Sequence, residues 1–533
     1  MSLKTVRGIH LKRSLSASLL ALVMASVLIL SACSSDKDNA SSPSASSSQP
    51  SESANNPSSS ESAAPADGDP FGGWVEGLPK IEAPAGFNWK QFEGTTLNVI
   101  TENTPPSSGL AANIAIFEKA TGIKVNIEQS NLDVVIEKAG LDFNARNDNF
   151  HIIYADPYQI LSKQSKHFLD LNTLIKDSSL PQIPGGIDDF IEAQLTANGY
   201  MGDKEHLYTL PYDNPTMILA YRKDVFEKYK DQFMADKGYD WTPGPDMTWD
   251  QYYEVAAWIN QQVKAGVITE VKYGTGHQAK QHDSLMNDFS NVLVSFGGEY
   301  FQAENIGSIG TTTPGKSLLT SPEALEAAEF YNKLLKEAAP GSKSWDWSGL
   351  AEAFAAGEIA MAPEWHEFSA TFEDPNSSTV VGKVDWTILP KGPKARGNMY
   401  GGTGVGINKY VSEKEQKAAW LFLIWATSPQ VQYQILDVGF TPTRHSVYNL
   451  PDIQKALNDL TSEEAKKLPL ASSLSAVQEA WKEGNVYMRP KIPMWPQVDT
   501  IVYTELSKML AGRQSPADAM KEISKQSNKL TGN

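Results

Sequence analysis

From residue 95 onwards, short apolar runs alternate with amphipathic segments. The pattern predicts β-strands at 96–100, 123–127 and 150–155 and helices at 110–120 and 133–145. Gly122 follows the first helix, in the position that commonly ends one. Strands that alternate with helices predict an α/β fold with a parallel, doubly wound sheet. Ligands bind such sheets beyond the carboxyl ends of the strands, so the residues after 100 and after 155 are candidate site positions.

The rest of the chain is predicted to contain both strands and helices, with more helix towards the end. Residues 71–94 are predicted to form an irregular lead-in. A capping sequence at Thr248–Gln251 begins a helix that ends near Lys264. The other predicted elements are extended segments at 207–211 and 217–222, strands at 359–362 and 384–389, helices at 281–296, 321–338, 349–357, 413–427 and 429–436, and a mostly helical region from 451.

The first 32 residues have the pattern of a targeting segment. A basic stretch precedes an apolar run of 16 residues at 15–30, which is short for a membrane span of about 20 residues. The sequence predicts a signal peptide at 1–32, with an uncleaved signal anchor as the alternative. Leu30–Cys33 resembles a bacterial lipobox, which implies that Cys33 is lipidated. A buried structural thiol is the alternative for Cys33.

Residues 33–70 are rich in Ser, Ala, Pro and Asn and contain no aromatic residue, so they are predicted to be a disordered tether. Together, these segments predict a globular body that a lipid anchor holds at the extracellular face of the cell membrane. Firm attachment requires at least two acyl chains.

Composition narrows the classes of partner. The chain has 533 residues, 46 basic and 63 acidic, and a formal net charge of −17. Removal of the first 32 residues, which carry four basic and no acidic side chains, would leave −21. This acidity argues against nucleic acid and against electrostatic docking on anionic lipid. A single cysteine excludes an intrachain disulfide and a cysteine metal cluster.

Nine blocks in the body resemble one protein family. They are FEKATGIKV at 117–125, HIIYAD at 151–156, LYTLPYD at 207–213, AYRKDVF at 220–226, TWDQY at 248–252, FAAGEIAMAPEW at 354–365, GGTGVGIN at 401–408, AAWLFLIWATSPQVQ at 418–432 and GFTPTRHSV at 439–447. Together with the lipobox and the tether, they resemble the family 1 extracellular solute-binding proteins of bacterial ABC importers. The resemblance is greatest to sugar-binding lipoproteins of Gram-positive bacteria.

The resemblance implies a two-lobed, type II periplasmic-binding-protein-like α/β fold with a hinge between the lobes. Lobe one would contain residues 95–212 and 362–406, and lobe two residues 213–361 and 407–533. The implied protein is a monomeric receptor without a cofactor and without catalytic activity. It would capture a carbohydrate, expected to be an oligosaccharide, and deliver it to the transmembrane subunits of an ABC permease.

Aromatic side chains are the first candidates for ligand contact, because their flat faces complement the C–H faces of sugar rings. The resemblance implies this role for Trp365 and Trp495. Trp345, Trp347 and Tyr400 are weaker candidates. The chain has 13 tryptophans, and packing in the core is the alternative for each of them.

Polar candidates follow the strands, where they could pair with ligand hydroxyls. By resemblance they are Glu102, Asn103, Asp156, Tyr158, Asp213, Asn214 and Glu364. Turn formation is the alternative for Asp156, which precedes a proline. His277, Gln278 and His282 can face the cleft in the family, but a solvated surface is the preferred expectation for them.

The glycines at 401–406 do not form a nucleotide-binding loop, because no strand-then-helix frame surrounds them. They instead predict a close approach of main chain at the cleft or hinge, with Gly402 as a candidate contact.

Two other functions remain open. A surface polysaccharide hydrolase would need two carboxylates at a defined separation, and the sequence has no H-E-x-x-H or G-x-S-x-G motif. A receptor of the same fold could bind a non-sugar solute, such as a peptide or a glycerol phosphodiester, and basic residues in the cleft would favour it. The placed blocks contain more carboxylates and aromatic residues than basic ones, which favours a neutral sugar.

Overall fold

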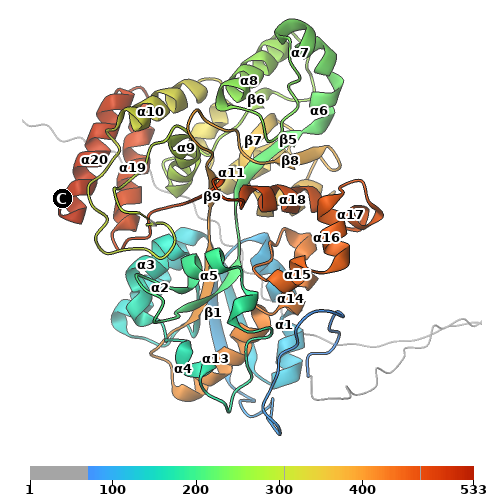
Figure 1. The fold of residues 1–533 in the computed structure, drawn as a ribbon, viewed down its shortest axis with the longest axis vertical. Helices are drawn as coiled ribbons and strands as arrows, with labels where there is room; N and C mark the ends of the chain where they lie inside the picture. The colour runs from blue at the N-terminus through green and yellow to red at the C-terminus, as the bar shows by residue number, and fades with distance from the viewer. Residues whose placement is uncertain (1–69, 305, 469) are drawn as a thin grey trace, which may run out of the picture. The chain divides into compact units, whose positions relative to one another are not determined.

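The computed structural model describes residues 70–304, 306–468 and 470–533. The predicted signal peptide, Cys33 and all but the last residue of the predicted tether therefore lie outside the described residues. Within these ranges, no helix has the length and apolar character needed to cross a membrane. The body contains two larger β-sheets, each surrounded by helices, and a third sheet of two short strands (Figure 1).

The first sheet has five strands in the order β2-β1-β3-β10-β4. These are β1 (Thr96–Glu102), β2 (Lys124–Ser130), β3 (Ile152–Ala155), β4 (Thr209–Asp213) and β10 (Thr403–Ile407). As predicted, β1 is parallel to both β2 and β3. The sheet is nevertheless mixed, because β10 comes from a distant part of the chain and runs antiparallel to β3 and β4.

Helices that accompany the first sheet begin and end where the sequence supplies caps. In the first helix, the Thr104 hydroxyl accepts a hydrogen bond from the backbone N–H of Ser107, and Gly122 closes the other end in a left-handed conformation. The helix starts earlier than predicted because two prolines fit its first turn. The helices are α1 (Pro105–Thr121), α2 (Leu132–Ala145), α3 (Ser162–Gln164), α4 (Asn172–Ile175), α5 (Glu192–Gly199), α13 (Glu413–Ala426) and α14 (Pro429–Gln434).

The second sheet has four strands in the order β6-β7-β5-β8. These are β5 (Met217–Arg222), β6 (Tyr273–Thr275), β7 (Ile359–Trp365) and β8 (Val384–Thr387). β5 is antiparallel to β7 and β8, and β6 is parallel to β7. Every residue of β5 and β7 is buried, as expected for central strands covered on both faces.

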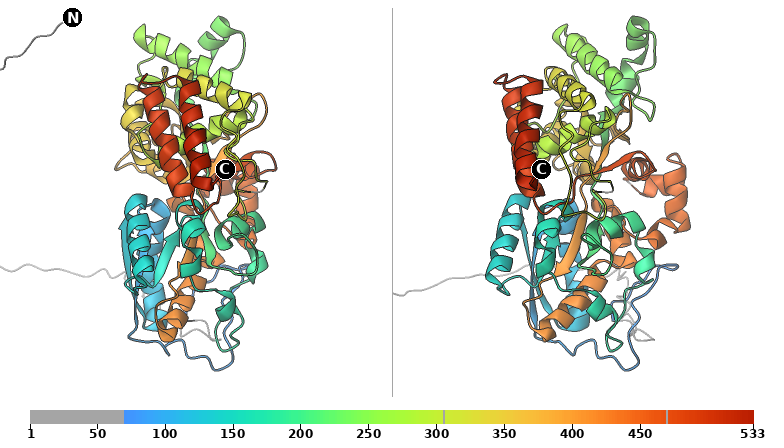
Figure 2. Two further views of the ribbon diagram at one scale, coloured as in Figure 1. Left: turned by 90° about the vertical axis from the view of Figure 1, so that its left-hand side faces the viewer. Right: turned by 60° about the vertical axis from the view of Figure 1, so that its left-hand side comes forward.

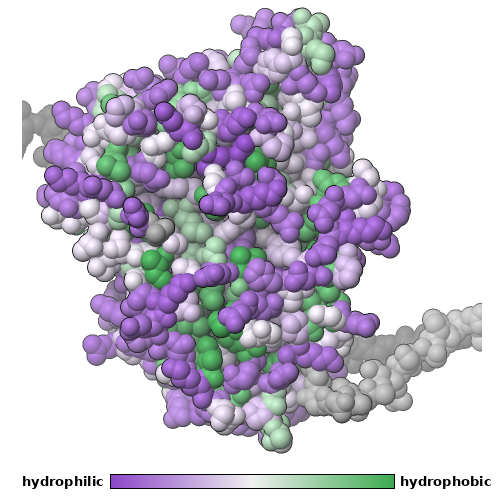
Figure 3. Space-filling model, in the orientation of Figure 1, coloured by the Kyte–Doolittle hydropathy of each residue, from purple (hydrophilic) through white to green (hydrophobic). Residues whose placement is uncertain are grey.

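The remaining helices lie mainly around the second sheet. Figure 2 shows α19 and α20 packed together on the outside of this group. The helices are α6 (Lys223–Lys228), α7 (Lys230–Lys237), α8 (Trp249–Lys264), α9 (Asp283–Ser295), α10 (Pro322–Leu334), α11 (Trp347–Ala355), α12 (Ser369–Glu373), α15 (His445–Tyr448), α16 (Pro451–Asn458), α17 (Glu463–Lys467), α18 (Ala471–Ala480), α19 (Trp495–Leu510) and α20 (Pro516–Thr531). Hydrophilic residues cover most of the face drawn in Figure 3.

The chain crosses between the sheets more than once. It passes from β4 to β5 at 214–216, and returns through β9 (Asn398–Tyr400) and Gly401–Gly402 to β10. β9 is parallel to β11 (Val486–Met488), close to the second crossing.

Two segments pack on a different sheet from most of the range with which the predicted lobes group them. β8, within 362–406, pairs with β5 of the second sheet, and α13, within 407–533, contributes Trp420 to the core of the first sheet. The local pattern predicts a strand or a helix at these places, but not the sheet against which it packs.

Candidate functional site

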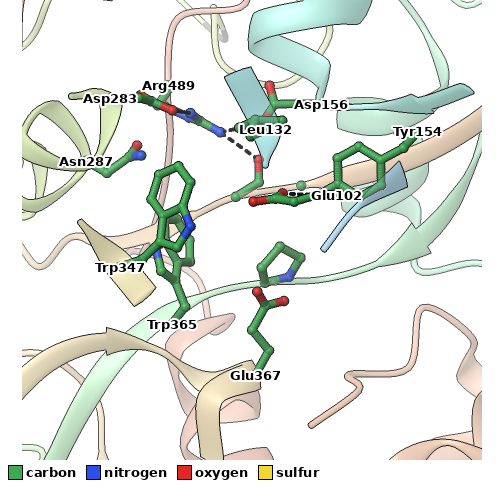
Figure 4. A pocket seen from close by; sticks show the side chains of 13 residues that line it. Glu102, Leu132, Tyr154, Asp156, Asp283, Asn287, Trp347, Trp365, Glu367 and Arg489 are labelled. Atoms are coloured by element: carbon green, nitrogen blue, oxygen red, sulfur yellow. Dashed lines mark hydrogen bonds and ion pairs between the residues drawn. The ribbon is translucent and has the colours of Figure 1, made fainter. Parts of the chain in front are cut away.

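A pocket lies between the two sheets, with about 400 Å³ of empty space, part of it open to solvent. Thirteen residues line it, and they come from both sheets and from the segments that connect them (Figure 4). They are Glu102, Leu132, Tyr154, Asp156, Pro215, Asp283, Asn287, Trp347, Trp365, Glu367, Gly401, Gly402 and Arg489.

The first sheet contributes two carboxyl groups at the ends of neighbouring parallel strands. Glu102 is the last residue of β1, and Asp156 follows β3 directly. The Tyr154 hydroxyl donates a hydrogen bond to Glu102 Oε2 over 2.9 Å. Asp156 Oδ1 accepts hydrogen bonds of 2.7 Å from the backbone N–H groups of the next turn. Burial raises the pKa of Glu102 to about 7, so that near neutral pH its carboxyl can accept or donate a hydrogen bond.

Arg489 joins the two sides of the pocket. It follows β11, and its Nη2 donates hydrogen bonds of 2.9 Å to Asp156 Oδ2 and to the Gly401 carbonyl oxygen. Its Nη1 lies 3.7 Å from Asp283 Oδ2. The guanidinium also lies over the ring of Tyr158, 4.4 Å from its centroid. Burial lowers the pKa of Arg489, but the charges of the two aspartates outweigh burial and raise it above its usual value, so the side chain stays charged.

The second sheet and its neighbouring helices supply aromatic and polar side chains to the wall of the pocket. Trp365 is the last residue of β7, and Trp347 begins α11. The ring of His282 packs edge-on against Trp347, with centroids 4.7 Å apart. Asp283 and Asn287 are four residues apart on α9, so both side chains point to the same face of that helix. The pocket therefore combines flat apolar surfaces with hydrogen-bonding groups (Figure 4).

A pair of carboxyl groups lies where the chain crosses between the sheets. Glu367 lines the pocket, and it is hydrogen-bonded to Asp213, the last residue of β4. Asp213 Oδ1 also accepts from the backbone N–H of Asn214 at 2.8 Å and of Thr441 at 3.2 Å. Burial raises the pKa of both carboxyls, and the charge of Asp213 raises that of Glu367 further, so the pair binds a proton more readily than a solvated carboxyl does.

The structure brings some of the sequence-derived candidates together at this pocket and separates others. Those that line it are Glu102, Asp156, Trp365 and Gly402, with Trp347 from the weaker aromatic set. Asn103 is exposed beside it. Buried positions outside the lining hold Tyr158, Asp213, Asn214, Glu364, Tyr400 and Trp495.

The buried candidates outside the lining have partners inside the protein. Glu364 Oε1 accepts from Gln278 Nε2 at 2.9 Å. The ring of Tyr400 packs edge-on against Trp481, and that of Trp495 against Tyr300 at 5.1 Å between centroids. Some side chains at strand ends or near prolines therefore face the pocket, and others face the core. These sequence features alone do not distinguish the two.

Several residues of the lining do not figure among the candidates from sequence. They are Leu132, Tyr154, Pro215, Asp283, Asn287, Glu367, Gly401 and Arg489. Asp283 and Asn287 carry a detectable signal, because they are polar, four residues apart, and on a helix whose other positions are mostly apolar. The expectation of a solvated surface is wrong for His277 and Gln278, which are 1% and 0% exposed. The pairing of His277 Nδ1 with Asp288 Oδ2 at 2.9 Å offsets part of the cost of burying this ring.

The raised pKa of Glu102 predicts a pH dependence of stability. Because this carboxyl binds its proton more tightly in the folded than in the unfolded chain, its contribution is fully present below about pH 4.5 and is lost as pH rises to about 7. Urea unfolding of a Glu102→Gln variant should therefore show a smaller decline across this range than the wild type, by about 3 kcal/mol. The exposed Glu137→Gln is the matched control and should keep the wild-type decline. Equal declines in all three proteins would contradict the assignment.

Comparisons with known proteins identify what the chain resembles. A family model described as bacterial extracellular solute-binding protein matches residues 101–433. A probable amino-acid ABC transporter periplasmic-binding protein of Sinorhizobium fredii is 22% identical over 81% of this chain and 89% of its own length. An erythritol/L-threitol-binding protein of Mycolicibacterium smegmatis is 20% identical over 69% of this chain and 74% of its own.

Solved structures of similar fold cover most of the described body. A solute-binding protein of Agrobacterium radiobacter in complex with ribitol has a TM-score of 0.67 and 24% identity, covering 82% of this chain and 99% of that one. Maltose-bound MalE3 of T. maritima has a TM-score of 0.66 and 24% identity, covering 82% and 100%. At this identity the likeness establishes the fold.

Proposed function

The chain belongs to the bacterial extracellular solute-binding proteins and has their two-lobed α/β fold, and from this premise we propose that it captures a polyhydroxylated solute for an ABC importer. The observation that carries the proposal is the pocket between the two sheets, where two indoles, four carboxyl groups and one arginine face the same space. Indole faces complement sugar C–H faces, and carboxyl and amide groups pair with hydroxyls.

The two sheets are proposed to be the cores of the two lobes, and the crossings at 214–216 and 401–402 to form part of the hinge. Hinge closure around a ligand is the recognised motion of periplasmic binding proteins. In such a motion the ligand stabilises the closed state by binding it more tightly than the open one. The lobes and their bound solute would then dock on the permease as one unit.

A solute with a free carboxylate is the second candidate, since a relative carries an amino-acid transporter name. The lining has one basic residue, Arg489, and its guanidinium is already paired with Asp156 and lies near Asp283. An incoming carboxylate would meet four acidic side chains and no unpaired base in this pocket. The charge of the pocket therefore favours a neutral solute. A polysaccharide hydrolase has less support, because the family consists of binding proteins.

A calorimetric panel of sugars, sugar alcohols, amino acids and peptides tests the proposal. We expect at least one sugar or sugar alcohol to bind, with an affinity that changes less than about twofold as salt is raised from about 0.02 to 0.5 M, because a neutral ligand forms no screened ion pair. Binding of amino acids or peptides without any carbohydrate would contradict it, as would a steep salt dependence.

We also propose that Cys33 carries a lipid, so that the receptor works from the extracellular face of the membrane. The support is the lipobox-like Leu30–Cys33 behind a 16-residue apolar run, with a Ser-rich tether after it. In cells that express the full chain, Cys33→Ser should move the protein from the membrane fraction to the medium. Ser34→Ala is the control and should remain in the membrane fraction. Retention of Cys33→Ser in the membrane would argue for a signal anchor instead.

A further inference from the structure

Contacts between the two lobes lie close to the pocket on several elements. Besides the Asp156–Arg489 pair, Gln159 Nε2 donates to Asp499 Oδ2 of α19 at 2.8 Å. The Tyr158 hydroxyl donates to the Gly307 carbonyl oxygen at 3.3 Å. The backbone N–H of Gly202 donates to the carbonyl oxygen of Ile309 at 2.8 Å. In this structure the two lobes are therefore already in contact around the pocket.

One edge of the pocket is bounded by α2 and α9. Leu132 lines the pocket at the start of α2, and the next residue, Asp133, lies 3.5 Å from His282 Nε2. His282 caps α9 and packs on Trp347, which lines the pocket too. A chain of contacts thus links Leu132 to Trp347 across the lobes. An extended ligand that left the pocket here would have to break the Asp133–His282 contact.

Main chain closes the side of the pocket next to the hinge. A Cβ added at Gly401 would lie 2.8 Å from Pro215 Cγ and 3.1 Å from the indole of Trp365. A Cβ at Gly402 would lie 2.7 Å from the ring of Tyr400 and 2.9 Å from Asn198 Oδ1. Neither position has room for even one more carbon atom. The pocket therefore cannot extend on this side, and part of its empty space of about 400 Å³ is open to solvent.

Two buried polar atoms of the lining, Asn287 Oδ1 and Arg489 Nε, have no hydrogen-bond partner among the residues that the structure describes. The carboxyl group of Asp283 is hydrogen-bonded to that of Asp499 on α19. Both unpartnered atoms come from the side of the second sheet, and buried polar groups of this kind are normally paired. An acceptor and a donor on one small pocket suit neighbouring hydroxyl groups, since a hydroxyl both donates and accepts.

We propose that the closed pocket takes one small polyhydroxylated molecule, a monosaccharide or a linear sugar alcohol, and that Asn287 and Arg489 determine which neighbouring hydroxyls are accepted. This inference rests on the proposed function and narrows it, since the sequence alone leads to the expectation of an oligosaccharide. The aromatic wall provides contact area, and the two unpartnered atoms provide selectivity.

A ligand series of increasing size tests the inference on the full body of the protein. Erythritol, ribitol, mannitol, glucose, maltose and maltotriose are compared by calorimetry and by the shift in melting temperature. We expect binding by at least one of the first four and at least about tenfold weaker binding of maltose and maltotriose. Tighter binding of maltose or maltotriose than of any smaller member would overturn the inference and leave the proposed function standing. Failure of every member to bind would overturn both.

A pair of variants tests the role of the unpartnered Asn287 oxygen. With the ligand from that series that binds tightest, Asn287→Leu removes an acceptor at nearly constant size and should lower the affinity about tenfold or more. Asn287→Asp keeps an acceptor oxygen at this position and should recover part of that loss. Asn144→Leu, an exposed site on α2, is the matched control with the wild-type affinity. Wild-type affinity in Asn287→Leu would overturn the assigned selectivity.

Discussion

Arg489→Ala is expected to abolish ligand binding and to lower the free energy of unfolding by about 3–5 kcal/mol, the largest effect of any single substitution in the pocket. The Arg489 side chain is 2% exposed, and its guanidinium bridges Asp156, which follows β3, and Asp283 of α9. Its removal leaves two buried carboxylates without a cation and the Gly401 carbonyl oxygen without its hydrogen bond. Denaturant unfolding and calorimetry measure the two losses separately.

The pH dependence of the Arg489→Ala effect gives a sharper check. Burial raises the pKa of Asp156, and the positive charge of Arg489 opposes that rise. Without Arg489 the pKa of Asp156 should rise further, so the variant can bind a proton and relieve the unpaired charge at acidic pH. The loss of stability should therefore be smaller at pH 5 than at pH 7.5. Arg513→Ala, at an exposed position, is the control and should change neither stability nor affinity. A loss for Arg489→Ala that does not vary with pH would contradict the ion-pair explanation.

The strands and helices in which apolar and polar residues recur regularly could be predicted from the sequence. The first three strands and their helices occur where the alternation of apolar and polar residues places them, and their parallel pairing follows from that order. The positions of Glu102 and Asp156 in the pocket also follow, because the carboxyl ends of neighbouring parallel strands meet at one edge of the sheet.

Long-range partners could not be predicted from the sequence. Arg489 lies 333 positions from Asp156, and nothing in its local surroundings indicates which carboxylate it meets. β8 and α13 follow the predicted pattern of strand and helix, yet the choice of sheet for each depends on packing that forms only in the complete fold. Glu367 could not be identified from the sequence for the same reason. Its partner Asp213 is close to it only after β4 and β7 have taken their positions in the fold.

Trp365 and Trp495 illustrate the same limit, because their sequence surroundings are similar while their environments differ. Both stand next to proline or one residue from it, and both are candidates from sequence. Trp365 lines the pocket, where its ring is close to Gly401. Trp495 does not line the pocket; it is 0% exposed and packs against Tyr300 in the hydrophobic core. Substitution of each should therefore affect a different property of the protein.

Trp365→Phe is expected to weaken ligand binding by about 10- to 100-fold, because a smaller ring loses part of its contact with the ligand. Trp495→Phe should leave the affinity within about twofold, while it lowers the free energy of unfolding by roughly 1–3 kcal/mol through the space left in the core. Calorimetry gives the affinities, and urea unfolding without ligand gives the stabilities. If Trp495→Phe weakened binding as much as Trp365→Phe in a protein of unchanged stability, Trp495 would have to reach the ligand, and the pocket assigned to this receptor would be wrong. Weaker binding in Trp365→Phe together with lower stability and unchanged affinity in Trp495→Phe would separate the tryptophan that binds the ligand from the tryptophan that only supports the fold.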